Sequence, residues 1–357
     1  MVEGFAAMYH TRTIVLTVAS ILLATTAARA APADRELIRE GVDLHDAGRY
    51  AEAIERFQRA LQAAPHDELA LYELANTYFY ARQLDRCVET AQKALAEHGE
   101  LGANLHSLLG SCLSDQGKDR EAIAVFEAGL RSYADNALLN FNAAVTYGEL
   151  HADDDAVACL RRAIAAEPDY ASPYLLLGNT LARQGRFSVA VFSMLRFLMA
   201  EPASPRSAGA AKDLFAHLYA GVEATGAKDV TITLGPGLGD DPLGTLEVSR
   251  SIVAAGSRVE DDEDGDDAGS PAARRVGALL TLAKITDELG AGDGGFKASP
   301  MWDAVVAPVL ELQDRDRLEA LGFVAAARAG LDGAEAWLGS HAARVADLER
   351  ATGHPVR

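Results

Sequence analysis

The sequence predicts an all-α protein whose first half is a solenoid of helix-turn-helix repeats, and three observations lead to this fold class. One pattern of small and bulky side chains returns every 34 residues, five times, between residues 34 and 204. Two positions in every repeat hold only small side chains, about half a repeat apart. Turn-forming glycines and helix-ending prolines stand at matching places in several repeats. Antiparallel helices that cross closely need such small residues where their backbones meet.

The five repeats are in register apart from Gly102, which falls between the second and the third. We place them at residues 34–67, 68–101, 103–136, 137–170 and 171–204. The eighth position of each repeat reads Gly41, Ala75, Gly110, Ala144 and Gly178. The twentieth reads Ala53, Cys87, Ala122, Ala156 and Ala190. These columns predict a first and a second helix in each repeat, with a close backbone crossing between them.

Breaker residues predict where these helices end. In three repeats a glycine lies between the two helical halves, where a left-handed residue can end the first helix without a Cβ clash. These glycines are Gly48, Gly117 and Gly185. Proline closes three repeats at the place where the second helix must stop, at Pro65, Pro168 and Pro202.

This period and these columns resemble the tetratricopeptide repeat, a helix-turn-helix unit of 34 residues. Repeat one carries the pattern in Gly41, Leu44, Gly48, Tyr50, Ala53, Phe57, Ala60 and Pro65. Repeat two departs from it, with Ala91 for the usual aromatic residue and Gly99 for the usual proline. The resemblance implies that stacked repeats form a superhelix with a concave groove. It also implies that the first helices line this groove and hold an extended or helical segment of another protein.

If the geometry is similar to that of the family, positions 2, 5, 6, 9, 12 and 13 of each repeat face the groove. The residues that we expect to bind a peptide there are Tyr72, Asn76, Phe79, Tyr80, Ser107, Ser111, Asn142, Asn179 and Arg183. The same positions include Arg35, Arg39, His45, Ser114 and Phe141. Asparagine amides can hold the backbone of a peptide, and aromatic rings supply contact area. Alternatively, Tyr72 and Phe141 pack against adjacent helices. The lysines that this family uses to clamp a C-terminal carboxylate are missing from this face.

The N-terminal residues 1–30 resemble a cleaved signal peptide. His10 and Arg12 precede an apolar run at residues 14–24, and Ala28 and Ala30 are small residues at the positions that determine cleavage. The apolar run is short for a bilayer span, so a cleaved signal is favoured over a membrane anchor. After cleavage behind Ala30 we expect no stable membrane insertion of the remaining chain. The true start is either Met1 or Met8. We therefore expect an exported protein, periplasmic or secreted.

Composition narrows the partners. A net charge of −19 argues against nucleic acid and against an anionic membrane surface as partners, because both need a basic protein surface.

The chain has three cysteines, Cys87, Cys112 and Cys159. One interpretation is that all three are small buried hydrophobic residues. The other is a Cys87–Cys112 disulfide, which would leave one thiol over. Whether the chain forms a homo-oligomer stays open.

Beyond the repeats, the pattern predicts a capping helix at residues 205–225 and a mostly helical region at residues 226–357. An apolar helical face runs along residues 211–222. Residues 230–234 alternate like a short strand without an evident partner, and residues 243–255 look helical. Residues 290–295 are rich in glycine and predict a loop. Three or four further helices follow the acidic run at residues 260–267, the first of them before this loop.

The acidic run at residues 260–267 predicts a solvated surface loop. A calcium loop would need a glutamate at its twelfth position, where counting from Glu260 gives Pro271. The glycines at 235, 237 and 239 lack the pattern of a phosphate-binding turn. No His-Glu-x-x-His or Gly-x-Ser-x-Gly motif occurs. We therefore expect no enzyme, no cofactor and no metal site.

The sequence thus favours an exported, non-catalytic scaffold or adaptor that binds a protein segment in its groove, in envelope assembly or secretion. In the alternative, the repeats are a docking or dimerisation module for an enzymatic or ligand-binding C-terminal region. A third interpretation makes the whole chain one continuous helical solenoid.

Overall fold

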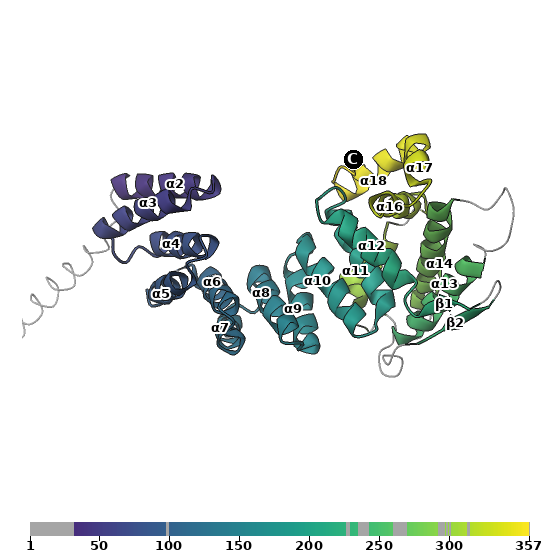
Figure 1. Cartoon of the computed structure of the whole chain (residues 1–357), viewed down its shortest axis with the longest axis horizontal. Coiled ribbons are helices and arrows are strands. Elements are labelled where there is room, and N and C mark those ends of the chain that lie inside the picture. The colour runs from purple at the N-terminus through teal and green to yellow at the C-terminus, as the bar shows by residue number, and fades with distance from the viewer. Residues whose placement is uncertain are drawn as a thin grey trace, which may run out of the picture. The chain divides into compact units, whose positions relative to one another are not determined.

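A computed structural model describes residues 32–97, 100–225, 229–234, 243–259, 270–291, 297, 299, 301–312 and 315–356. The expected signal peptide, the glycine-rich turn at 235–239 and the acidic run at 260–267 lie outside these residues. The fold is all-α, as predicted, apart from two short strands in the described residues (Figure 1). Contacts divide the chain into two compact units, the first ending at Gly117 and the second beginning at Lys118.

The first unit contains two complete repeats and the first helix of a third. Its helices are α2 (Pro32–Asp46), α3 (Tyr50–Ala63), α4 (Glu68–Tyr80), α5 (Leu84–Leu95) and α6 (Gly102–Asp115). Helices α2 and α3 pair as a hairpin, and so do α4 and α5. The small-residue columns form these crossings. A Cβ added to Gly41 would lie 2.6 Å from the ring of Phe57, and Ala53 and Ala75 are fully buried.

A disulfide joins Cys87 of α5 to Cys112 of α6, with the two Cα atoms 6.3 Å apart. Of the two interpretations that the sequence left open, the bridge is therefore the one that the structure supports. Cys159 is free and buried.

The second unit begins with six helices that complete the repeats and cap them. These are α7 (Asp119–Ser132), α8 (Ala137–Glu149), α9 (Asp153–Ala166), α10 (Ala171–Arg183), α11 (Phe187–Ala200) and α12 (Ser207–Leu218). Helix α11 is apolar on nearly all sides, because it contacts α10 on one side and α12 and later helices on others. Its Phe197, which stands where a small residue is expected, is fully buried.

The turn between first and second helix has the same left-handed backbone in all five repeats. Gly48, Gly117 and Gly185 have φ values of +72° to +75°, as the sequence predicted. In repeats two and four the same position is taken by Arg82 (φ 58°) and His151 (φ 56°). The repeat geometry therefore imposes this conformation even where no glycine is present.

The capping helix is shorter than the predicted 205–225, because it ends at Leu218 and Gly221 turns the chain with a φ of +72°. Strand β1 (Val222–Ala224) follows and pairs antiparallel with β2 (Val230–Ile232). The predicted strand is confirmed, and its partner is β1.

The remaining elements are helical, as predicted. They are α13 (Gly244–Val259), α14 (Pro271–Ala291), η2 (a π-helix, Trp302–Val306), α15 (Ala307–Leu310), α16 (Arg315–Arg328), α17 (Ala334–Ser340) and α18 (Ala342–Thr352). The loop expected from residue 290 is wrong at its start, because Gly290 and Ala291 belong to α14. Gly290 is buried there against the indole of Trp302, where a Cβ would not fit.

The C-terminal elements share a core with the last repeat. Helix α11 contacts η2, α13, α15 and α16, and α12 contacts α13 and α16. No helix of the described residues is both long enough and apolar enough to span a membrane. A domain boundary at residue 226 stays a prediction.

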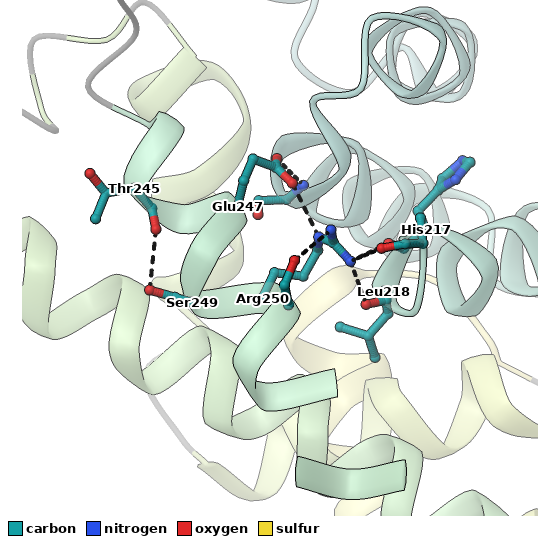
Figure 2. Close-up of polar contacts among 9 residues, drawn as sticks. His217, Leu218, Thr245, Glu247, Ser249 and Arg250 are labelled. Carbon is teal, nitrogen blue, oxygen red and sulfur yellow. Dashed lines mark hydrogen bonds and ion pairs between the residues drawn. The ribbon is translucent and has the colours of Figure 1, made fainter. Parts of the chain in front are cut away.

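Arg250 of α13 holds this arrangement together (Figure 2). Its side chain is 2% exposed and bonds to Glu247 Oε2 at 3.1 Å. It also donates to the carbonyl oxygens of His217, Leu218 and Ala220, at 3.2, 2.8 and 3.0 Å. Glu247 Oε1 accepts from the backbone N–H of Ser188 at 2.6 Å. One buried ion pair thus ties α13 to the end of α12 and to the start of α11.

Candidate functional site

Four rings gather where α2 ends and α4 ends in the first unit, and we call them the aromatic patch. They belong to His45, Tyr50, Phe79 and Tyr80. The Tyr80 ring lies edge-on to His45 at 5.1 Å and to Phe79 at 5.6 Å, and it stacks with Tyr50 at 6.2 Å. Tyr80 is nevertheless 54% exposed. The patch is a preformed apolar surface that water still reaches.

A chain of two hydrogen bonds fixes the imidazole of His45. The Thr77 hydroxyl donates to the carbonyl oxygen of Glu73 at 2.7 Å, which uses its single hydrogen. His45 Nδ1, 3.0 Å from Thr77 Oγ1, must therefore donate to it. Partial burial lowers the pKa of His45, so the ring favours its neutral form.

Negative charge lies beside the patch. Glu73 is half-buried and forms no ion pair with a described residue. Burial, and secondly the charge of Asp46, raise the pKa of Glu73. Burial also raises the pKa of Tyr72, with Glu73 and Tyr80 as further causes. Glu73 is therefore within electrostatic reach of Asp46 and Tyr72, and Tyr72 is within reach of Tyr80.

Several arginines of this unit pair with carboxylates outside the patch. Arg39 contacts Glu36, Arg56 contacts Glu40, and Arg82 contacts Asp115. The carboxylates beside the aromatic patch are thus left without a cation from the described residues.

The residues predicted to bind a peptide in this unit have different surroundings. Tyr72, Asn76 and Phe79 are half-buried and Tyr80 is exposed. The Asn76 amide hydrogen-bonds to no other described residue. Ser111 is half-buried, and its hydroxyl donates to the Ser107 carbonyl oxygen at 2.9 Å. The expectation for Ser107 is not met, since this residue is 2% exposed and does not offer its side chain to a ligand.

The predicted residues of the second unit lie on α8 and α10. Asn142 and Asn179 are half-buried, and the Asn179 amide bonds to no other described residue. Arg183 is exposed, and its guanidinium is held by Asp153 at 2.6 Å. Phe141 lies edge-on to Tyr170 at 5.3 Å, as the packing alternative expected.

Sequence reasoning missed the carboxylates Asp46 and Glu73 as part of the site. Both stand at positions that the repeat pattern points toward the groove, so the signal was present. The repeat pattern could not show that Asp46 and Glu73 lack an arginine partner among the described residues.

A cavity of about 1420 Å³ lies in the second unit, between α13, α14 and the segment from Trp302 to Leu312. Its wall is mainly apolar, with Ile252, which is 59% exposed, at one side. The described lining includes neither histidine nor cysteine. No cluster of three or more metal-binding side chains occurs in the part of the chain that the structure describes.

Comparison with known protein families gives two matches. Residues 44–112 and residues 154–208 each match a model of the tetratricopeptide repeat. No curated protein sequence matches this chain.

Several solved structures are similar to about half of the chain. One is TTC0263, a thermophilic tetratricopeptide-repeat protein in Thermus thermophilus, at 25% identity and a TM-score of 0.45, covering 51% of this chain and 99% of that one. Another is PilW, a type IV pilus biogenesis factor, at 20% identity and 0.47, covering 53% and 86%. A third is YrrB, a repeat protein with an unusual peptide-binding site, at 17% and 0.37, covering 51% and 92%.

Proposed function

Since this chain is a tetratricopeptide-repeat protein, we propose that it is a non-catalytic adaptor that binds a segment of another protein through its first helices. The observation that carries the proposal is the aromatic patch of His45, Tyr50, Phe79 and Tyr80. Tyr80, exposed at the end of a first helix, is of a residue type that is enriched among the side chains that dominate protein interfaces, and the half-buried Phe79 adds apolar contact area beside it. Their mutual ring contacts limit the entropy that binding would cost.

The charges beside the patch indicate the chemistry of the segment. Asp46 and Glu73 have no cationic partner among the described residues, and Tyr72 lies within electrostatic reach of both Glu73 and Tyr80. A lysine or arginine would gain from both the carboxylates and the π-faces of the rings. The segment is therefore expected to carry a basic residue next to an apolar one.

Asparagines supply a second kind of contact. The amides of Asn76 and Asn179 are half-buried and unbonded to the rest of the described chain. Each offers a donor and an acceptor for a peptide backbone. This supports binding of an extended segment at each unit.

Export is part of the proposal. The features of residues 1–30 support cleavage and release outside the cytoplasm, with envelope assembly or secretion as the process. The Cys87–Cys112 bridge is of a kind that persists in oxidising compartments.

The test begins with affinity capture of the chain from its native envelope after brief cross-linking. The partner segment is then synthesised, and its Kd is measured with the wild type, Tyr80→Ala and a matched Tyr133→Ala control. Tyr133 is 37% exposed and lies outside the patch. Loss of a central tyrosine should weaken binding by about tenfold or more, whereas the control should leave it unchanged. Equal affinity for all three chains would remove the aromatic patch from the function.

The rival function places ligand binding in the C-terminal elements, and the 1420 Å³ cavity favours it. Thr281 is exposed and lines this cavity, so Thr281→Trp would fill part of it. If capture of the partner is lost with Thr281→Trp but retained with Tyr80→Ala, ligand binding by the C-terminal elements is the better explanation of the function.

A further inference from the structure

A second, smaller cavity of about 480 Å³ opens on the second helices of repeats four and five. It lies between α9, the loop and start of α10, α11 and the η2–α15 segment, all within the second unit. The proposed protein-binding residues are on first helices, so this cavity is a separate site. Three arginines line it, Arg161, Arg162 and Arg196.

Arg161 is the central observation. It is half-buried, its Nε is enclosed, and its guanidinium makes no hydrogen bond or ion pair with any described residue. Burial, and secondly the neighbouring charge of Arg162, lower the pKa of Arg161. A protein of net charge −19 has many carboxylates, yet none of the described ones compensates this cation. Leaving a half-buried guanidinium unpaired costs free energy, and a bound anion would recover it.

Arg196 of α11 has a guanidinium group whose position is fixed by contacts with Tyr174 and Pro168. Its Nη2 donates to the Tyr174 hydroxyl at 3.1 Å and to the Pro168 carbonyl at 3.3 Å. Its Cζ lies 4.9 Å above the centre of the Tyr174 ring. The Tyr174 hydroxyl in turn donates to Pro168 at 2.9 Å, and Tyr174 is 1% exposed. Arg196 Nη1 lies 3.9 Å from the sulfur of Met199, and Arg196 Nε is enclosed and has no partner among the described residues. A cation fixed before binding loses little entropy when it binds.

The other charges of the lining set the expected charge of the ligand. Arg162 is exposed at the rim, with Nη1 3.9 Å from the sulfur of Cys159. Asp303 is exposed on the η2 wall and pairs with no described cation. Three guanidinium groups and one carboxylate leave a net charge of +2. The remaining wall is apolar, with Ile164 and Pro308 among its residues.

We propose that this cavity binds a small organic phosphate, a phosphate monoester attached to a compact apolar body. A phosphate monoester carries a charge near −2 at neutral pH, since its second pKa is about 6. Its oxygens suit the forked donors of arginine, which bind phosphate with two parallel hydrogen bonds. The volume falls within the range of about 300–1,000 Å³ that is usual for small-molecule sites.

The test uses phenyl phosphate as the probe, titrated into the purified chain by calorimetry at low salt and pH 7.5. The comparison includes phenol, which has the apolar body without the charge, and inorganic phosphate, which has the charge without the body. The variants are Arg161→Gln and, as a matched control, Arg120→Gln. Arg120 is exposed on α7 in the same unit and is not among the residues that line the cavity.

We expect phenyl phosphate to bind the wild type and the Arg120→Gln control more tightly than phenol or inorganic phosphate does. Arg161→Gln should raise its Kd at least about tenfold, which is the usual worth of a charge-assisted hydrogen bond. Absence of phenyl phosphate binding to the wild type, or equal Kd values for wild type and Arg161→Gln, would overturn the proposal. Phenol binding as tight as phenyl phosphate binding would overturn it too.

The free protein supplies an independent check. If Arg161 serves a ligand, removing its uncompensated charge should leave the thermal midpoint of the ligand-free chain unchanged or raise it. If Arg161 instead stabilises the fold, Arg161→Gln should lower that midpoint, and the proposal fails. Arg162→Gln, at the exposed rim, provides a second variant in which loss of phenyl phosphate affinity is expected without a change in stability.

Discussion

Glu247 is buried and Glu73 is half-buried, but only Glu247 has a cation beside it. Arg250 and a backbone N–H occupy the two oxygens of Glu247, so this carboxylate is part of the core. Glu73 lies half-buried next to Asp46, without a cation from the described residues. The same functional group thus stabilises the fold at one place and costs stability at the other. Costs of the second kind are typical of residues kept for binding.

The first prediction concerns Glu73→Gln. Because the folded-state pKa of Glu73 is raised, its stabilising protonation is complete below the ordinary value of 4.5 and is lost as pH rises through the folded pKa. The ionised carboxylate therefore destabilises the fold at pH 7, and the neutral amide should raise the thermal midpoint there. At pH 4 the difference should shrink. Glu55→Gln, on the exposed face of α3, is the control and should show neither effect. A midpoint for Glu73→Gln below that of the wild type at pH 7 would contradict this account.

A second prediction concerns Arg250→Met. The change leaves Glu247 and three carbonyl oxygens without their donor in a buried place. Breaking a buried pair in this way costs about 3–5 kcal/mol. Urea denaturation should show this loss in the free energy of unfolding, while Arg120→Met, at an exposed position, should stay near the wild type. A loss smaller than about 1 kcal/mol would mean that α13 is held mainly by apolar contacts.

Among the elements, the repeat helices and strand β2 were predictable, whereas strand β1 was not. Each repeat helix carries its own period of small and bulky residues, so columns such as Gly41 and Ala53 fix both its place and its partner. Strand β1 has three residues, directly after α12, and Val222 fits the apolar face of that helix. Three residues, Tyr219, Ala220 and the left-handed Gly221, separate the two, and a lone glycine is a weak signal in a sequence. Ser107 was misjudged for a related reason, because a groove position does not reveal how deep its side chain lies.

A third prediction follows for Gly221→Ala. The added Cβ would lie 2.3 Å from the carbonyl oxygen of Thr233, in a backbone with φ of +72°. The left-handed conformation alone costs a non-glycine residue about 1–2 kcal/mol, and the clash adds to it. The matched control is Gly209→Ala in α12, where a Cβ meets no atom within 4 Å. That control should be stabilising by about 0.5–1 kcal/mol. Thermal unfolding of the two variants should therefore shift in opposite directions, and equal shifts would contradict the strained turn.

At the scale of the whole molecule, the net charge is negative although one cavity is lined mainly by positive charges. The chain carries −19, yet Arg161, Arg162 and Arg196 meet in one cavity. Composition argues against nucleic acid as a partner, but it could not reveal this cavity, since its arginines come from α9 and α11 and its carboxylate from η2. The aromatic patch was partly predictable, because Phe79 and Tyr80 follow the repeat register.

The fourth prediction is that the native host cleaves the chain after Ala30. The mature protein should begin at Ala31, which intact-mass measurement of the protein isolated from the envelope would show. The same sample should consume no thiol reagent at Cys87 and Cys112 unless it is first reduced. A cytoplasmic protein that retains Met1 or Met8, with both thiols free, would contradict the proposed export.

The Cys87–Cys112 bridge also determines how the N-terminal edge of the array frays. Linear repeats open from their ends, one hairpin at a time, because each hairpin is held only by its neighbours. Helices α2 and α3 can detach in this way without breaking a covalent bond. The hairpin of α4 and α5 cannot detach by itself in the next step, because the disulfide joins α5 to α6. Amide hydrogen exchange at this edge should therefore proceed in two blocks of unequal protection, and a reductant should merge the second block into the ordinary stepwise series.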